Sequence, residues 1–215
     1  MMAGLWRMGK ICMISTGDTG YGETFSATEM FAPFRPGPAQ RQLIGYWQSR
    51  RAGDGMPHWR DVDPLDIPHL LAHIWISELS GEGQAVPVYR LAGTEICRLH
   101  GGELRGRKVQ EALNRPYAPF LARVLQDAFK GTAAAIRVQD VDRHPDYDSY
   151  ECVLLPVHRG EGLNVIGLTT FARKIENRSL TFRRSWDIRV LQHDTATGDE
   201  WWLDTEGGKT SVAPL

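Results

Sequence analysis

Two side chains that can bind a metal lie three residues apart in the string CRLHG. On a short helix this spacing places the thiol of Cys97 and the imidazole of His100 on one face, toward a metal or a haem iron. A protein metal site usually supplies three or four such ligands, and no second pair with ligand spacing accompanies these two. We therefore interpret Cys97 as a core cysteine beside a half-exposed histidine, and we predict no metal and no cofactor.

The loop DVDRHPDYDSYE gathers carboxylates around His144, and carboxylate oxygens are ligands that calcium and magnesium prefer. Its acidic residues are Asp140, Asp142, Asp146 and Asp148. Pro145 interrupts the loop, and the glycine and distal glutamate of an EF-hand are absent. We interpret the loop as a solvated turn between two strands.

The sequence lacks the motifs of common enzymes. Asp142 and His144 could be two members of a hydrolase triad, but the sequence has no Gly-x-Ser-x-Gly elbow or comparable site for the nucleophile. A hydrolase triad therefore has no support. The early string TGDTGYGE lacks the spacing of phosphate-binding glycine loops. We predict that the protein is not an enzyme.

A basic stretch runs from Arg173 to Arg189 and could contact nucleic acid or an acidic partner. Its members are Arg173, Lys174, Arg178, Arg183, Arg184 and Arg189. The end of the chain is acidic, with Asp194, Asp199, Glu200, Asp204 and Glu206. Because this tail can neutralise the basic stretch in place, we expect a solvated, self-paired surface and no nucleic-acid partner.

Composition indicates one globular domain with tails. Of the 215 residues, 42% are hydrophobic and 24% charged, and the net charge of -1 gives no bulk attraction to nucleic acid or anionic membranes. Three widely spaced cysteines, Cys12, Cys97 and Cys152, fit a reducing cytoplasm better than a disulfide framework. We expect a cytoplasmic protein without a signal peptide or membrane span, since no apolar run approaches about 18 residues.

The chain divides into three parts. Residues 1–37 show no sustained periodicity and are predicted to be a mobile arm. Residues 38–174 carry the elements of the domain, beginning with an amphipathic helix from Ala39 to Arg51. Residues 175–215 form an extension, basic and then acidic, in which SWDIRVLQ could add a strand and the last dozen residues are expected to be loose.

Strands and helices alternate in a simple order between the helix and the extension. HIWISEL and VPVYRLAG predict a hairpin, and GTEICRLHGG, VQEAL and the stretch after Asn114 predict helices. TAAAIRVQDV, YECVLLPVHR and NVIGLTTFARK then predict three strands. Tight turns between neighbouring strands require a mostly antiparallel sheet with the helical middle on one face, which excludes doubly wound parallel folds.

This order, together with local motifs, resembles the PAS domain family, in particular stand-alone bacterial, alphaproteobacterial members with an amino-terminal cap helix. The motifs are LIGYWQSRRAGDGMPHWRDVDPLDIPHLL, YRLAGTEICRLHG, GELRGR and ECVLLPVHRGEGLNVIGLTTF, which together cover about residues 38–174. The resemblance implies an α+β fold: a five-stranded antiparallel sheet with helices packed on one face, plus an amino-terminal helix and a carboxy-terminal extension. It implies a sensory or regulatory role and no substrate. CRLHG differs from the cysteine loop of flavin-binding photosensors because Ile96 stands in place of asparagine, so a flavin adduct is not expected.

Strand alternation and the helix face outline the concavity in which PAS domains hold ligands. The expected pocket residues are Leu91, Cys97, His100, Phe120, Val124, Ile136, Tyr150, Cys152, Leu154 and Phe171. The alternative is a filled core without a ligand, because close packing is the default for protein interiors.

These observations leave two hypotheses. The first is a PAS-type sensory module, without its own output domain, that binds a small apolar or amphipathic molecule or a signalling protein. The second is a structural protein–protein interaction domain with a filled core. We also expect a homodimer built on Leu43, Tyr46 and Trp47, although their helix could equally dock on its own sheet and leave a monomer.

Overall fold

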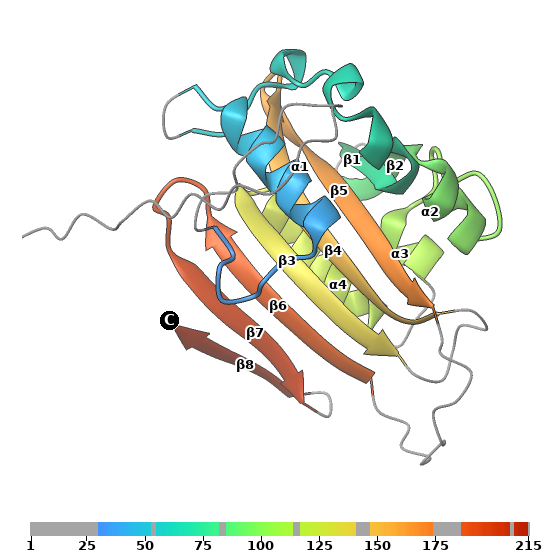
Figure 1. The fold of residues 1–215 in the computed structure, drawn as a ribbon, viewed down its shortest axis with the longest axis vertical. Helices are drawn as coiled ribbons and strands as arrows, with labels where there is room; N and C mark the ends of the chain where they lie inside the picture. The colour runs from blue at the N-terminus through green and yellow to red at the C-terminus, as the bar shows by residue number, and fades with distance from the viewer. Residues whose placement is uncertain are drawn as a thin grey trace, which may run out of the picture.

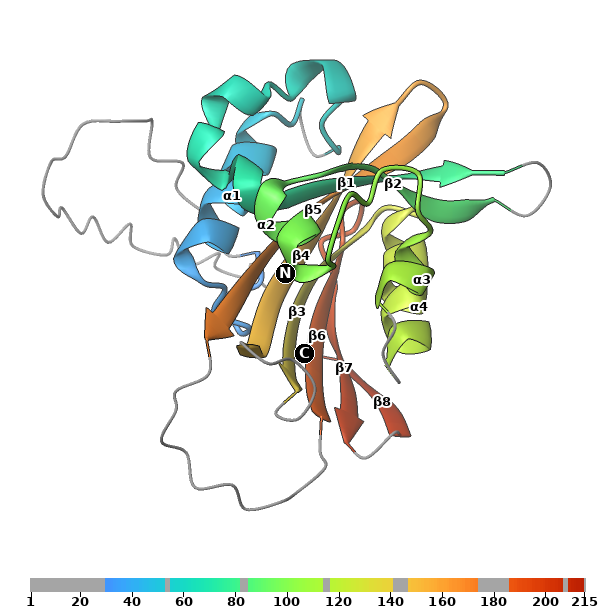
Figure 2. The ribbon, with the colours of Figure 1, turned by 90° about the vertical axis from the view of Figure 1, so that its right-hand side faces the viewer.

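The computed structural model describes residues 30–52, 55–81, 85–113, 117–140, 147–173, 186–206 and 209–214. These residues form one eight-stranded antiparallel sheet in the order β2-β1-β5-β4-β3-β6-β7-β8, with helices on both faces (Figure 1; Figure 2). The strands are β1 (Ile74–Ser80), β2 (Val86–Ala92), β3 (Thr132–Asp140), β4 (Tyr147–Arg159), β5 (Gly162–Arg173), β6 (Trp186–Asp194), β7 (Glu200–Glu206) and β8 (Lys209–Pro214). The helices are α1 (Pro38–Ser49), α2 (Thr94–Leu99), α3 (Val109–Leu113) and α4 (Ala118–Ala128), and the 3-10 turns are η1 (Trp59–Asp61), η2 (Pro64–Asp66) and η3 (Pro68–His73).

The first five strands and the helices between them confirm the predicted PAS-like arrangement. Strands β2, β1, β5, β4 and β3 lie side by side, and α2, α3 and α4 cover one face, which we call the inner face. On α4, Leu121, Val124 and Leu125 recur at spacings of three and one and are all buried. That stripe packs against the sheet as an amphipathic helix must.

Helix α1 crosses the opposite face of the sheet, which we call the outer face (Figure 1). Leu43, Tyr46 and Trp47 are each only 1% exposed, and the indole Nε1 of Trp47 donates to the carbonyl oxygen of Pro156. The structure therefore realises the second alternative for this helix: it docks on its own sheet. These three side chains are buried against the chain's own sheet, so a dimer contact through them, which stays a prediction, would require α1 to leave that sheet.

The polar end of α1 holds the segment DVDPLD (Asp61–Asp66) in place. The hydroxyl of Tyr46 donates to the carbonyl oxygen of Asp63, and the amide of Asp63 donates back to that hydroxyl at 2.7 Å. Arg50 forms an ion pair with Asp66 at 2.8 Å. Burial, with a further contribution from the nearby carboxylate of Asp66, raises the pKa of Tyr46, so the hydroxyl stays protonated and can donate.

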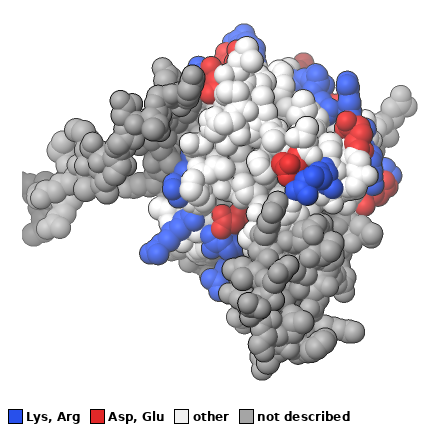
Figure 3. Space-filling view, turned by 45° about the vertical axis from the view of Figure 1, so that its right-hand side comes forward, with Lys and Arg blue, Asp and Glu red and all other residues white. Residues whose placement is uncertain are grey.

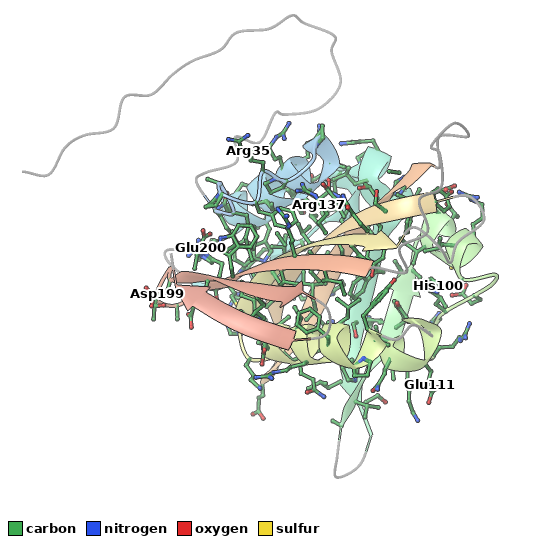
Figure 4. The ribbon with its side chains drawn as sticks, turned by 90° about the horizontal axis from the view of Figure 1, so that it is seen from below. Arg35, His100, Glu111, Arg137, Asp199 and Glu200 are labelled. Carbon is green, nitrogen blue, oxygen red and sulfur yellow. The ribbon has the colours of Figure 1, made fainter. Side chains whose placement is uncertain are left out.

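The structure corrects the predicted mobile arm over residues 30–37, which we call the strap (Met30–Gly37). Met30, Phe31 and Phe34 are buried, and the ring of Phe34 stacks on Trp202 of β7 with centroids 6.2 Å apart. The amide of Phe31 donates to the carboxylate of Glu200 at 2.9 Å. Figure 4 shows Glu200 and Arg137 on the side of the sheet that carries α1. Residues 1–29 lie outside the described part of the chain.

The extension also differs from the prediction, because it enlarges the sheet to eight strands instead of five. Strand β6 pairs with β3 along its whole length, from Thr132 opposite Asp194 to Asp140 opposite Trp186. Strands β7 and β8 follow by antiparallel pairing, so the last residues are not loose where the structure describes them. The open edge of β3 supplies the backbone partners for β6, and no local sequence pattern reveals that edge.

The structure explains the residues of two motifs that resemble the PAS family, YRLAGT and GELRGR. A side chain at Gly93 would place its Cβ 2.2 Å from the carbonyl oxygen of Leu71, so the turn from β2 into α2 requires glycine. In the GELRGR loop, the amide of Gly106 donates to the carbonyl oxygen of Tyr89. The amide of Tyr89 in turn donates to the carbonyl oxygen of Arg107. This loop thereby pairs with the outer edge of β2.

In the described part of the chain, no helix has the length and apolar character that a bilayer crossing requires.

Candidate ligand-binding core

The inner face of the sheet and helices α2–α4 enclose a continuous cluster of buried side chains, which we call the inner core. Most of the predicted pocket residues meet there. Val124, Ile136, Cys152 and Leu154 are buried, and Phe120, Tyr150 and Phe171 pack against them in part. The alternation of β4 is as the sequence indicates, because Val153 and Leu155 lie instead in the cluster of buried side chains on the outer face, which we call the outer core.

Three predicted residues lie at the margin or outside. Leu91 is 46% exposed on edge strand β2 and takes no part in the inner core. Cys97 and His100 are half-buried on and just after α2. The thiol of Cys97 lies 3.6 Å from the carbonyl oxygen of Ala92, and Nδ1 of His100 lies 3.1 Å from that of Ala112. His100 therefore links the end of α2 to α3 instead of reaching into the core.

The inner core contains a set of polar side chains, which we call the inner polar group: Trp75, Tyr89, Cys152 and Thr169. The sequence analysis predicted only Cys152 among them and missed the other three. The indole Nε1 of Trp75 donates to the hydroxyl oxygen of Thr169 at 3.0 Å. The rings of Trp75 and Tyr89 meet edge to face, with centroids 5.6 Å apart. Cys152 stands opposite Thr169 across strands β4 and β5.

Trp75 lies flat on the sheet because Gly167 leaves room for it. The two residues are cross-strand partners in β1 and β5, and a Cβ at Gly167 would come within 2.1 Å of the indole ring. The glycine thus allows the indole to reach Thr169. This pairing fixes the position of the inner polar group.

Burial controls the protonation of the inner polar group. Loss of solvent raises the pKa of the Cys152 thiol to about 12, and contacts with Thr169 and Trp75 act in the opposite direction without offsetting it. Burial also raises the pKa of Tyr89 above its ordinary value, with the Cys152 thiol adding to the effect and Arg107 opposing it. Both groups are neutral hydrogen-bonding groups at physiological pH. A protonated thiol is a poor nucleophile, so Cys152 is suited to contact a ligand and not to attack one.

A weak signal in the sequence could have located Trp75. Alternation in HIWISEL puts Ile74 and Ile76 on one face and Trp75 on the other, and the structure shows this division between the outer and inner cores. Nothing local indicates that Thr169, 94 residues later, accepts its hydrogen bond.

Helix α2 is tied to the sheet beside the inner core. Arg98 forms an ion pair with Glu95 at 2.7 Å and donates to the hydroxyl of Tyr147 on β4. The ring of Tyr147 packs against Phe171 with centroids 5.2 Å apart. A movement of α2 would therefore change the contacts of Tyr147 on β4 and of Phe171 on β5.

The other sequence-based sites gain no support as metal centres. Among the described residues, no group of three or more His, Cys, Asp or Glu side chains could hold a metal ion. Asp142, His144 and Asp146 lie outside the described residues, as do Cys12 and the basic stretch from 174 to 185. Arg189 is described and exposed on β6, where it faces Arg137 in register.

Comparison with known proteins gives one finding. A family model described as a PAS domain matches residues 35–170, which include α1, the five expected strands except the last residues of β5, and the inner core apart from its residues on β6, β7 and the end of β5. No curated protein and no solved structure matches the chain.

Proposed function

Because the chain belongs to the PAS domain family of sensory and regulatory modules, we propose that its inner core binds a small apolar or amphipathic molecule and that binding alters contacts on the outer face. The inner polar group carries this proposal. A core that only had to pack would favour apolar side chains, since polar groups are costly to bury unless they are hydrogen-bonded. Here an indole N–H, two hydroxyls and a thiol are grouped within apolar walls. Small-molecule sites typically combine such walls with a few convergent polar groups.

Strand β4 connects the two faces. Cys152 and Leu154 lie in the inner core, whereas the intervening Val153 packs in the outer core. The neighbouring Glu151 accepts from the amide of Gly37, and its carbonyl oxygen accepts from Gln40 of α1. A ligand that shifts β4 would change these contacts with α1 and the strap. Signalling then follows from a population shift between two arrangements, provided the ligand binds one of them better.

A second candidate, a protein–protein interaction module with a filled core, is favoured by the packing. Val124 is 1% exposed and Val138 is fully buried, and close packing is the default for such an interior. The surface in Figure 3 shows charged side chains in small groups around a broad uncharged area. Because the cores of protein–protein interfaces are depleted in charged residues, such a surface suits a protein partner.

The two candidates differ in what purified protein carries. We would record native and denaturing mass spectra and an absorption spectrum of the freshly purified full chain. Ligand binding predicts an additional mass in the native spectrum that is released on denaturation. The filled-core candidate predicts the mass of the polypeptide alone.

A pair of variants on α4 tests where such a ligand lies. Val124→Phe inserts a larger side chain into the inner core, whereas Gln126→Phe inserts the same side chain on the exposed face of the helix. A ligand in the inner core should be lost from Val124→Phe and retained by Gln126→Phe. Retention by both variants would place the ligand elsewhere and contradict the proposal.

A further inference from the structure

Two histidines face each other where the connector after α1 meets the end of β4. His58 and His158 form an isolated parallel bridge, and the amide of His158 donates to the carbonyl oxygen of Pro57 at 2.8 Å. Their ring centroids are 5.3 Å apart with an angle of 34° between the ring planes. His58 is exposed and His158 half-buried, so a dissolved ion can reach the pair.

The ring nitrogens of this pair differ from those of the other described histidines in their hydrogen bonding. Each of the others has a ring nitrogen near an oxygen of the chain: His69 with Gln42, His73 with Thr169, His100 with Ala112 and His193 with Glu200, at 2.9 to 3.2 Å. Within the described part of the chain, no hydrogen bond or ion pair engages the ring nitrogens of His58 or His158. Their lone pairs thus remain available for a ligand.

We propose that His58 and His158 together bind a divalent transition metal ion of the Zn²⁺ class. With metal–nitrogen bonds of about 2.0 to 2.1 Å and a tetrahedral angle between them, two coordinated imidazole centroids lie about 5 Å apart. The observed centroid separation of 5.3 Å is close to this value. Imidazole nitrogen suits Zn²⁺, Ni²⁺ and Cu²⁺, and not the oxygen-seeking Ca²⁺ and Mg²⁺.

The site is open, because the described residues provide no third protein ligand. Water or exogenous groups complete the coordination, and the protein supplies one ligand fewer than the three of a catalytic zinc site. A metal here joins the connector from α1 to the strand that carries Pro156, the acceptor of the Trp47 indole. Since an ion that binds only the folded chain stabilises it by mass action, binding raises the melting temperature.

The test uses the full chain without an affinity tag, freed of metal with a chelator that is then removed. Isothermal titration with ZnCl2 measures the dissociation constant for wild type, His58→Gln, His158→Gln and the control His69→Gln. His69 is also exposed, but its ring nitrogen is already engaged by Gln42. We expect one ion per chain, with affinity reduced at least about tenfold in each of the first two variants and unchanged in the control.

Two further readouts protect the result from a folding artefact. Far-ultraviolet circular dichroism checks that each variant is folded, and the exposed position of His58 makes His58→Gln the safer variant. Electron paramagnetic resonance of the wild type with one equivalent of Cu²⁺ should show coupling to two imidazole nitrogens, and that of His58→Gln to one. The proposal is overturned if wild type binds no Zn²⁺, if either variant binds as tightly as wild type, or if His69→Gln loses as much affinity as they do.

Discussion

The indole Nε1 of Trp47 donates a buried hydrogen bond to the carbonyl oxygen of Pro156, 2.8 Å away, and thereby fastens α1 to β4. Trp47 is 1% exposed, and Pro156 belongs to the LLPV stretch whose flanking residues Leu155 and Val157 form part of the outer core. The contact joins two motifs that lie 109 residues apart in the chain.

Replacing Trp47 should destabilise the monomer itself. Trp47→Ala removes a buried aromatic side chain and should lower the free energy of unfolding by about 3 to 5 kcal/mol. Trp47→Phe keeps most of the apolar volume and should cost about 1 to 3 kcal/mol, since the Pro156 carbonyl loses its partner. Urea denaturation measures both. The control is Gln42→Ala on the exposed face of α1, which should stay within about 0.5 kcal/mol of wild type.

The same residue distinguishes internal docking from a dimer interface. Trp47→Glu places a charge in the outer core without a partner, so we expect it to unfold the protein. Light scattering and circular dichroism measured together decide the matter. Folded monomers of Trp47→Glu obtained from a dimeric wild type would show instead that α1 can leave its sheet and pair with a second copy.

Gly167→Ala should damage the inner core by overpacking. The added methyl group would meet the Trp75 ring at 2.1 Å, and such clashes cost about 1 to 3 kcal/mol or more. Gly162→Ala, on the same strand, is the matched control, because its Cβ meets nothing closer than 4.0 Å. Thermal unfolding and near-ultraviolet circular dichroism report the change. In the Trp75→Leu background the Gly167→Ala penalty should shrink, and an undiminished penalty would contradict the stacking explanation.

The protonated state of Cys152 leads to a pH dependence with a definite sign. The thiol's ordinary pKa near 9 applies to the unfolded chain, and burial raises it to about 12 in the folded chain. The neutral thiol therefore contributes stability that is fully present below about pH 9 and is lost as the pH rises toward 12. Tyr89, whose pKa burial also raises, acts in the same direction. Unfolding free energies measured across this range should fall less steeply in Cys152→Ala than in wild type.

Thiol labelling tests the same assignment at neutral pH. Cys97 is half-buried and Cys152 is 5% exposed, so iodoacetamide at pH 8 should modify Cys97 well before Cys152. Peptide mass spectrometry measures the two rates separately. Comparable rates in the folded protein would show that the inner core opens to solvent more readily than its packing indicates.

The strap should protect the carboxy-terminal strands. Phe34→Ala removes the stack on Trp202 and the ring beneath the Arg137 guanidinium, so amide hydrogen exchange in β6 and β7 should accelerate. Exchange in β4 and β5 should change little. Arg35→Gly is the control within the strap: Arg35 is exposed with a left-handed φ of 54°, which glycine adopts without strain. Equal exchange in wild type and Phe34→Ala would mean that β6 and β7 do not depend on the strap.

The sequence alone determined the parts of this protein that follow local periodicity. Alternation in YECVLLPV assigned Cys152 and Leu154 to one face and Val153 to the other, and helical spacing identified Val124 on the buried side of α4. These assignments hold because the pleat of a strand and the pitch of a helix fix which side chains share a face, whatever the partner. The order of the elements along the chain was also read from local patterns, and the family motifs added the PAS fold to which that order belongs.

Only the tertiary structure decided the contacts between distant segments. The amide of Phe31 donates to the carboxylate of Glu200 across 169 residues, and this contact joins part of the predicted mobile arm to the carboxy-terminal extension. Trp75 and Thr169 are brought together by the pairing of β1 with β5, which local sequence does not encode. As a sequence pattern, the amphipathic face of α1 predicts docking on its own sheet and docking on a second copy equally well. In the structure α1 packs on the outer face of β4 and β5, which offers Trp47 both apolar cover and the Pro156 carbonyl.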